Sequence, residues 1–276
     1  MHRRFVTLVR SFAAVAALAA ASAAPAADLS KVYRIAFPTA ETGFDPARVS
    51  DLYSNTVNEA IFERLLTYDY LARPAKLVPL AAEAMPQVTD NGRTYTFRIR
   101  KGIHYVADPA FKGRKRELVA GDFAYVIKRH ADPRNRSPWA FMVEGRIAGL
   151  DDAIAQARKS GRFDYDAKIP GLETPDPYTL VIRLVAPDYL FNYTVAHVPY
   201  GAMAREVVEA YGDDIGAHPV GTGPYVLKEW KRASRIVLEA NPLDDIANTR
   251  RIRDVYLRGE RLDRAAFGAA WAASTP

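Results

Sequence analysis

The sequence predicts a mixed α/β protein of the α+β class. One segment, 94–100, alternates apolar and polar residues as a half-buried strand does. Other segments repeat apolar residues every three or four positions, which is typical of amphipathic helices. The two kinds of segment do not alternate regularly, as they would in a parallel sheet, and no internal repeat interrupts them.

The composition excludes several kinds of site. The 276 residues include no cysteine, which excludes a disulfide scaffold, a thiolate metal site, a thiol nucleophile and a lipid-modified N-terminal cysteine. Hydrophobic residues make up 49% of the chain and charged residues 25%, as in folded proteins. The length allows one large domain or two of average size.

Residues 1–27 have the pattern of a secretory signal peptide. Three arginines precede an apolar run at 11–24, and Ala-Pro-Ala at 24–26 predicts cleavage after residue 26 or 27. The run is shorter than the roughly 20 residues of a membrane-spanning helix; an interfacial anchor helix is the alternative. Removing the segment lowers the formal net charge from +6 to +3, because it takes away three arginines and no acidic residue. No basic patch then indicates a nucleic-acid partner, and we expect a soluble monomer outside the cytoplasm.

The first elements follow from periodicity and turn residues. A strand is expected at 31–37, ended by Pro38. A helix is expected at about 50–66, where apolar residues recur every four positions and Ser50 or Asp51 can cap. The strand at 94–100 follows the turn at 90–92 and directs Tyr95, Phe97 and Ile99 toward the core.

The later elements follow from the same signals. A helix is expected at 121–130, with Asp122 in its first turn, where the helix dipole favours a carboxylate. Its inward residues are Phe123, Val126 and Ile127. The remaining expected elements are a helix at 151–159 stopped by Gly161, a strand at 178–185, a helix at 202–211 ended by Gly212, and paired strands at 225–230 and 235–239, with Tyr225 and Trp230 in the core.

The sequence lacks the common catalytic and metal-binding motifs. None of its five histidines lies within five residues of another, which excludes HxH and HExxH pairs. Gly221-Thr222-Gly223 is followed by Pro224 and a strand, so no helix N-terminus is available there to hold a phosphate. Paired carboxylates at 151–152 and 213–214 are explained by helix ends and turns. We therefore expect no enzymatic activity, no cofactor and no metal.

A series of short motifs resembles a family of binding proteins. In chain order they are Phe44-Asp45-Pro46, the segments IFERLL at 61–66, LAAEA at 80–84, TYTFRIRKGIHY at 94–105 and VAGDFAY at 119–125, then Asp132-Pro133, Ser137-Pro138 and VGTGPY at 220–225. Together they resemble the extracytoplasmic solute-binding proteins of peptide and nickel ABC importers, the oligopeptide-binding type of family 5. Three features depart from the family pattern. Arg64 replaces a glycine, Met85 stands where a core tryptophan is common and is expected to fill that gap, and the basic loop at 107–117 is longer.

The resemblance implies a periplasmic binding protein of type II, which closes over its ligand by a hinge. It implies that 28–46 and 190–240 belong to the first lobe and that 47–189 form its extra subdomain, with a hinge near 191–199. We expect the second lobe to be absent from this sequence. The resemblance also implies that the backbone of Ser50, Asp51 and Leu52 and the aromatic ring of Trp139 contact the ligand. For Ser50 and Asp51 the alternative is a helix cap, and for Trp139 it is the core.

Residues 241–276 do not continue that family. The stretch resembles the C-terminus of imidazolonepropionase-like amidohydrolases, with a strand and turn expected at 252–260. We therefore expect a foreign tail, by chimerism or truncation, on an impaired first lobe; a short protein with a divergent end is the alternative.

Three functions are compatible with these features. The first is the periplasmic substrate-binding component of an ABC importer, which binds a small peptide or similar solute and delivers it to a permease in the inner membrane. The second is an amidohydrolase-related fragment, and the third is a secreted domain that binds another ligand such as haem. The basic loop at 107–117 is either a solvated turn or a contact for an acidic partner.

Overall fold

The computed structural model describes residues 35–240, 255–257 and 260–262. The chain divides into two units, Met1–Pro38 and Thr39–Pro276. In the first unit, residues 35–37 are irregular rather than a strand, and Ile35 is 62% exposed. The predicted strand is wrong over these residues because alternation alone supplies no partner strand. The rest of it, like the predicted signal peptide, lies outside the described residues.

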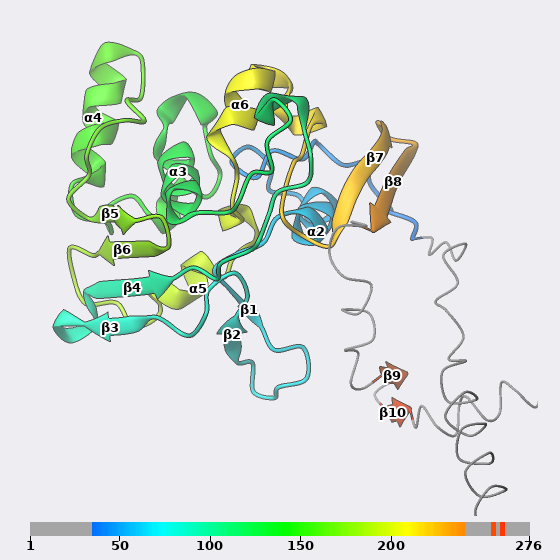
Figure 1. Ribbon diagram of the computed structural model, residues 1–276, viewed down its shortest axis with the longest axis horizontal. Helices are drawn as coiled ribbons and strands as arrows, with labels where there is room; N and C mark the ends of the chain where they lie inside the picture. The colour runs from blue at the N-terminus through cyan, green and yellow to red at the C-terminus, as the bar shows by residue number, and fades with distance from the viewer. Residues whose placement is uncertain (1–34, 241–254, 258–259, 263–276) are drawn as a thin grey trace, which may run out of the picture. The chain divides into compact units, whose positions relative to one another are not determined.

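A four-stranded antiparallel sheet with the order β3-β4-β6-β5 lies in the second unit (Figure 1). Its strands are β3 Gln87–Thr89, β4 Thr94–Arg98, β5 Leu172–Asp176 and β6 Thr179–Arg183. The predicted alternation is confirmed, since Tyr95, Phe97 and Ile99 are at most 1% exposed. The turn before β4 is also confirmed, and its residues 90–92 all have positive φ angles.

In Figure 1, helices lie above β5 and β6, and others lie between the sheet and the hairpin formed by β7 (Tyr225–Lys231) and β8 (Arg235–Ala240). They are α2 Leu52–Ile61, α3 Ala120–Ala131, α4 Leu150–Ser160, α5 Phe191–Val195 and α6 Arg205–Tyr211. Short 3-10 helices lie at Asp90–Gly92, Pro109–Phe111, Pro133–Asn135, Ala140–Met142, Val198–Tyr200 and Gly212–Ala217. Helix α3 packs on β5 and β6 through its predicted inward residues Phe123, Val126 and Ile127, all at most 3% exposed.

The predicted helix at 50–66 is shorter than expected. It ends at Ile61, and Phe62 is already extended. The chain then forms the small antiparallel pair β1 Leu66–Tyr68 and β2 Leu77–Pro79. The helix ends early because Leu65 and Leu66 interact across this strand pair and not along a helix. The Leu80 amide, for example, donates a hydrogen bond to the Leu65 carbonyl. The helix predicted at 202–211 likewise begins only at Arg205.

The hairpin β7 Tyr225–Lys231 and β8 Arg235–Ala240 confirms the predicted strand pair. Tyr225 is 43% exposed, so the prediction that it lies in the core is wrong. Among the described residues these two strands form a two-stranded ribbon, with no further strand beside them to cover Tyr225. Met85 is also 43% exposed and does not fill a core gap, because it lies in a bend just before β3.

Part of the C-terminal stretch is described. Strands β9 Val255–Leu257 and β10 Glu260–Leu262 form an antiparallel pair, in agreement with the predicted strand, while the residues of the predicted turn between them lie outside the described part of the chain. The other residues of the predicted foreign tail lie outside the described part of the chain. Among the residues that the structure describes, no helix has the length and apolar character needed to span a bilayer.

Candidate ligand-binding site

The first predicted site segment lies at the start of α2. Asp51 is the N-cap of this helix, because its Oδ1 accepts a hydrogen bond from the Ser54 amide at 2.7 Å. Its Oδ2 accepts from the Thr42 hydroxyl at 2.6 Å. Burial raises the pKa of Asp51, but these hydrogen bonds outweigh it and hold the pKa below its usual value. The carboxylate of Asp51 thus serves the fold, while Ser50 and Leu52, the latter 70% exposed, remain on the surface.

The second predicted site residue, Trp139, lies beside this segment. Its indole Nε1 donates a hydrogen bond to the carbonyl of Val49 at 2.7 Å, although the two residues are 90 positions apart. The ring packs on His197 with a centroid separation of 4.5 Å. The structure therefore brings Ser50, Asp51 and Leu52 together with Trp139, with the aromatic ring half-buried.

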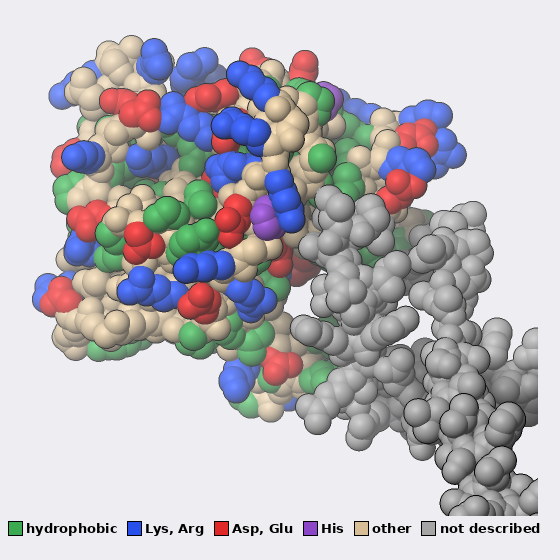
Figure 2. Space-filling model, viewed as in Figure 1, with side chains coloured by type: hydrophobic (Ala, Val, Ile, Leu, Met, Phe, Trp, Pro, Cys, Tyr) green, Lys and Arg blue, Asp and Glu red, His purple; other side chains and the backbone are tan. Residues whose placement is uncertain are grey.

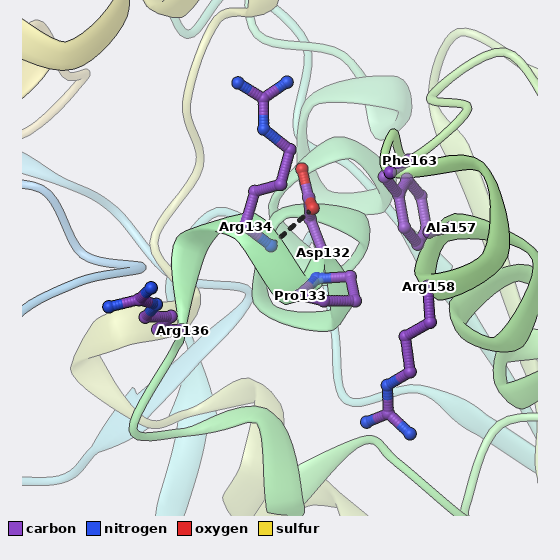
Figure 3. A pocket seen from close by; sticks show the side chains of 8 residues that line it. Asp132, Pro133, Arg134, Arg136, Ala157, Arg158 and Phe163 are labelled. Atoms are coloured by element: carbon purple, nitrogen blue, oxygen red, sulfur yellow. Dashed lines mark hydrogen bonds between the residues drawn. The ribbon is translucent and has the colours of Figure 1, made fainter.

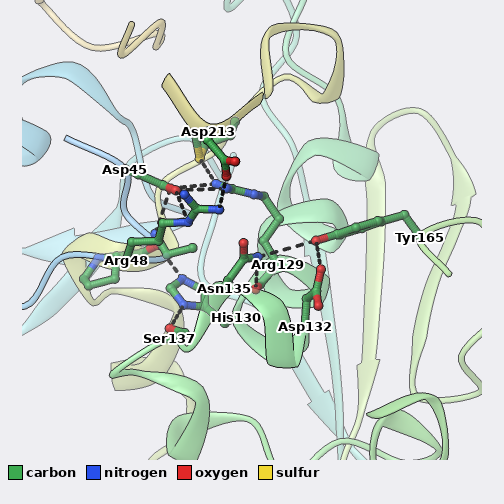
Figure 4. A network of polar contacts seen from close by, with 12 residues as sticks. Asp45, Arg48, Arg129, His130, Asp132, Asn135, Ser137, Tyr165 and Asp213 are labelled. Atoms are coloured by element: carbon green, nitrogen blue, oxygen red, sulfur yellow. Dashed lines mark hydrogen bonds and ion pairs between the residues drawn. The ribbon is translucent and has the colours of Figure 1, made fainter. Parts of the chain in front are cut away.

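The loop that carries Trp139 is held by the end of α3. The His130 imidazole is 2.7 Å from the Ser137 hydroxyl and 2.8 Å from the Pro199 carbonyl (Figure 4). The Tyr200 hydroxyl donates to the Trp139 carbonyl at 2.9 Å. Burial lowers the pKa of His130 to about 4, so its ring is neutral at pH 7. These contacts fix the backbone of the loop at Trp139, whose side chain is half-buried.

A buried ion pair anchors the other segment. The Arg129 guanidinium donates to both carboxylate oxygens of Asp45 at 2.8 and 3.0 Å, and both side chains are at most 4% exposed (Figure 4). Burial raises the pKa of Asp45, but the Arg129 charge and hydrogen bonds outweigh it and the pKa is lowered. Since Asp45 lies four residues before Val49, the ion pair and the tryptophan hold the same short segment from two sides.

The Gly221-Thr222-Gly223 segment is a packing contact at the end of α2. A Cβ atom on Gly221 would lie 1.9 Å from the Ile61 carbonyl oxygen, and the Gly223 amide donates to that oxygen at 2.8 Å. The glycines allow two backbones to touch, so the motif has a structural explanation and no phosphate loop is needed.

The predicted basic loop contributes one arginine to the protein interior. Arg116 donates to Asp122 at 2.6 Å and to Glu206 at 2.9 Å, so its acidic partners lie within this chain. Arg114 and Lys115, exposed on the same loop, line a cavity of about 300 Å³. On the visible face of the described residues, basic and acidic side chains are interspersed (Figure 2).

A larger cavity, of about 480 Å³, is lined by none of the predicted site residues. It is lined by eight residues, Asp132, Pro133, Arg134, Arg136, Ala157, Arg158, Gly161 and Phe163. Its three arginine side chains point away from one another (Figure 3), so they do not converge on one ligand group. Among the residues that the structure describes, no cluster of three or more His, Asp or Glu side chains is suited to a metal ion.

The sequence did not single out His197 or the exposed aromatic residues near it. Tyr68 and Tyr193 are 48% and 42% exposed, and their ring centroids lie 6.2 Å apart. Their exposure is a tertiary property that hydrophobic periodicity does not reveal. Together the two rings form an exposed aromatic pair.

Comparison with known proteins identifies the family. Residues 76–253 match the family described as bacterial extracellular solute-binding proteins, family 5 middle. This is more than half of the chain. The chain is a family 5 solute-binding protein. The family match includes residues 241–253, which the sequence assigned to a foreign tail, while the predicted lobe and subdomain boundaries remain predictions.

Curated relatives of this solute-binding protein support the assignment. The periplasmic oligopeptide-binding protein OppA of Salmonella typhimurium is 29% identical over 201 residues, covering 72% of this chain and 34% of the relative. The glutathione-binding protein GsiB of Escherichia coli is 29% identical over 191 residues, covering 69% of this chain and 31% of the relative. The chain thus spans about a third of the length of these relatives.

Solved structures establish the fold class of this solute-binding protein. OppA of Haemophilus influenzae in complex with the peptide RPPGFSPFR has a TM-score of 0.60 and 27% identity, covering 72% of this chain and 36% of the other. OppA of Burkholderia pseudomallei has a TM-score of 0.62 and 25% identity, covering 75% and 37%. The fold is mixed α/β and corresponds to part of a type II periplasmic binding protein, as the sequence predicted.

Proposed function

We propose that this chain binds short peptides non-covalently as the substrate-binding component of an ABC importer. In this proposal it catalyses no reaction, acts as a monomer in the periplasm after removal of its signal peptide, and passes its solute to a permease. The relatives named for oligopeptide and glutathione binding support a ligand that contains peptide bonds.

The observation that carries the proposal is the hydrogen bond between Trp139 and Val49. Through this bond the Trp139 indole contacts Val49, which directly precedes the exposed Ser50 at the start of α2, and this supports a role for both segments in binding. A backbone segment with exposed side chains can pair with an extended peptide through main-chain hydrogen bonds, while the flat ring covers one ligand side chain. A site that recognises the main chain in this way can bind peptides of many sequences, because all peptides have the same backbone.

Isothermal titration calorimetry with mixed short peptides tests this function. We expect heat of binding with unmodified peptides and at least a tenfold loss of affinity when the same peptides carry N-methylated peptide bonds, since methylation removes the main-chain donors. Equal binding of both forms contradicts backbone recognition, and no binding of any peptide contradicts the function.

Two variants locate the site. Leu52→Ala removes an exposed side chain from the proposed contact and is expected to weaken peptide binding severalfold. Val88→Ala is the matched control, because Val88 is also exposed, at 39%, but lies on the edge strand β3 of the sheet. Equal affinities for the two variants would place the peptide elsewhere.

A further inference from the structure

The basic loop at 107–117 lines a cavity with three consecutive cations. The cavity has a volume of about 300 Å³, and its lining residues are Phe111, Arg114, Lys115, Arg116 and Glu206. This volume is at the lower end of the range that holds small ligands. None of the predicted ligand-binding residues lines the cavity, so the proposed peptide binding gives it no role.

Contacts with the rest of the unit hold this loop. The Phe111 ring is 3% exposed and packs on Tyr105 with a centroid separation of 5.9 Å. The Asp108 carboxylate accepts a hydrogen bond from the Tyr211 hydroxyl of α6 at 3.0 Å. The Arg114 amide donates to the Phe111 carbonyl at 3.1 Å. The basic side chains therefore start from a defined backbone, which lowers the entropic cost of holding a ligand between them.

Arg116 has no donor left for a ligand. Its guanidinium donates to Asp122 at 2.6 and 3.1 Å, to Glu206 at 2.9 and 3.4 Å and to the Glu117 carbonyl, which occupies all five N–H groups. Burial raises the pKa of Glu206, but the hydrogen bonds and charge of Arg116 outweigh it and lower the pKa, so Glu206 is charged. With Asp122 also ion-paired to Arg116, these three side chains together carry one negative charge.

Arg114 and Lys115 are the cations available to a ligand. Both are exposed, and within the described part of the chain neither forms an ion pair. The Arg114 Nε lies 3.5 Å from the Phe111 carbonyl, and its two Nη atoms keep four free N–H groups. The Lys115 ammonium offers three more. Their two positive charges exceed the negative charge of the Arg116 group, so the cavity favours an anion.

We propose that Arg114 and Lys115 bind a phosphate monoester in this cavity. Their seven N–H groups exceed the roughly four lone-pair sites of a carboxylate. A phosphate monoester presents three strong acceptor oxygens and a charge of about −1.5 to −2 at pH 7, and both cations can give it charge-assisted hydrogen bonds. The phosphodiester of a membrane lipid has fewer terminal oxygens and less charge. This inference goes beyond the proposed peptide binding and does not depend on it.

Calorimetry on the full chain in phosphate-free buffer tests the cavity with glycerol 3-phosphate and glycerol, which differ only in the phosphate group. We expect glycerol 3-phosphate to bind and glycerol to bind at least tenfold more weakly. Absence of binding by glycerol 3-phosphate overturns the proposal. Cosedimentation with phosphatidylglycerol vesicles tests the lipid source. Retention on these vesicles by a chain that does not bind glycerol 3-phosphate would assign the cavity to a phosphodiester and overturn the monoester.

Variants of two lysines on this loop locate the site. Lys115→Gln and Lys112→Gln each remove one positive charge from an exposed side chain, but only Lys115 lines the cavity. We expect Lys115→Gln, like Arg114→Gln, to weaken glycerol 3-phosphate binding at least tenfold, and Lys112→Gln to weaken it less than about threefold. Equal losses in the two lysine variants would show attraction to the overall charge of the loop and would overturn the site.

Discussion

His130 shows how one residue positions the candidate site. The Pro199 carbonyl can only accept, so Nε2 of His130 carries the ring proton and Nδ1 accepts from the Ser137 hydroxyl. The side chain is 1% exposed, and burial lowers its pKa to about 4 from a usual value of 6.5. Protonation would put a charge in the interior and force the hydrogen bond with Ser137, next to Trp139, to reverse its direction.

This pKa predicts a loss of stability in mild acid. The unfolded chain binds a proton at His130 below about pH 6.5 and the folded chain only below about pH 4. The unfolded state is therefore favoured progressively as the pH falls between these values, by about 3 kcal/mol in total. Urea unfolding at pH 7, 5.5 and 4 should show a steeper decline for the wild type than for His130→Gln. Parallel declines would contradict the prediction, as would an NMR titration of the His130 ring with a midpoint near 6.5.

At the residue scale the sequence predicted which segments belong to the candidate site, whose role in binding stays a prediction, but not how these segments meet. The family-like motifs placed Ser50, Asp51, Leu52 and Trp139, and the structure brings them together. Asp51 is a cap, one of the two alternatives considered for it. The bond from Trp139 to the Val49 carbonyl could not be predicted, because its acceptor is a backbone atom 90 positions away that every residue type provides. The position of His197 against Trp139 depends on tertiary packing in the same way.

At the scale of elements, the end of α2 depends on a close backbone contact. The Gly223 amide donates to the Ile61 carbonyl, and Gly221 touches the same carbonyl. Backbone atoms cannot rotate away as a flexible side chain does. The contact joins α2 to the segment that enters the hairpin β7-β8.

We therefore predict that Gly221→Ala strongly destabilises the protein. The added Cβ would lie 1.9 Å from the Ile61 carbonyl oxygen, which requires the two segments to separate. Overpacking of this kind typically costs 1–3 kcal/mol, and we expect about 3 kcal/mol or more because both groups are backbone. Gly121→Ala is the matched control: its Cβ would meet only Val119 Cγ2 at 3.9 Å, and in helix α3 alanine is favoured by up to about 1 kcal/mol. Urea denaturation that gave both variants the same midpoint would contradict this account.

The elements that the sequence predicted are those with a long or regular pattern. Helix α3 and strand β4 have clear periodicity, and both were predicted to within a few residues. Strands β1, β2 and β3 have three residues each, too few for any period to appear, and they were missed. Short elements of this kind form because a neighbouring strand offers hydrogen bonds.

At the scale of the whole molecule, the segment 41–49 ties distant parts of the second unit together. The Glu41 carboxylate accepts from the Trp230 indole and from the Ala233 amide of the hairpin β7-β8. The Phe44 ring lies 4.9 Å from that of Trp230, and the Phe44 amide donates to the Gly216 carbonyl. Asp45 and Val49, bound to Arg129 and Trp139, extend the connection to α3 and the candidate site. These contacts attach the hairpin to the rest of the unit.

Hydrogen exchange of Glu41→Ala tests whether Glu41 specifically attaches the hairpin. Glu41 is 5% exposed. Burial raises the pKa of its carboxyl group, but the hydrogen bonds from Trp230 and Ala233 outweigh burial and lower the pKa. The carboxylate is therefore charged and hydrogen-bonded. Its removal leaves two donors unpaired at a cost of about 1.5–3 kcal/mol, which corresponds to a roughly tenfold to hundredfold loss of protection in residues 225–240. Protection in α3 should fall much less. The matched control is Glu239→Ala, which removes an exposed partner of Lys228 within the hairpin and should change protection little. If Glu41→Ala lowered protection equally throughout the described unit, Glu41 would stabilise the whole unit and not specifically the attachment of the hairpin.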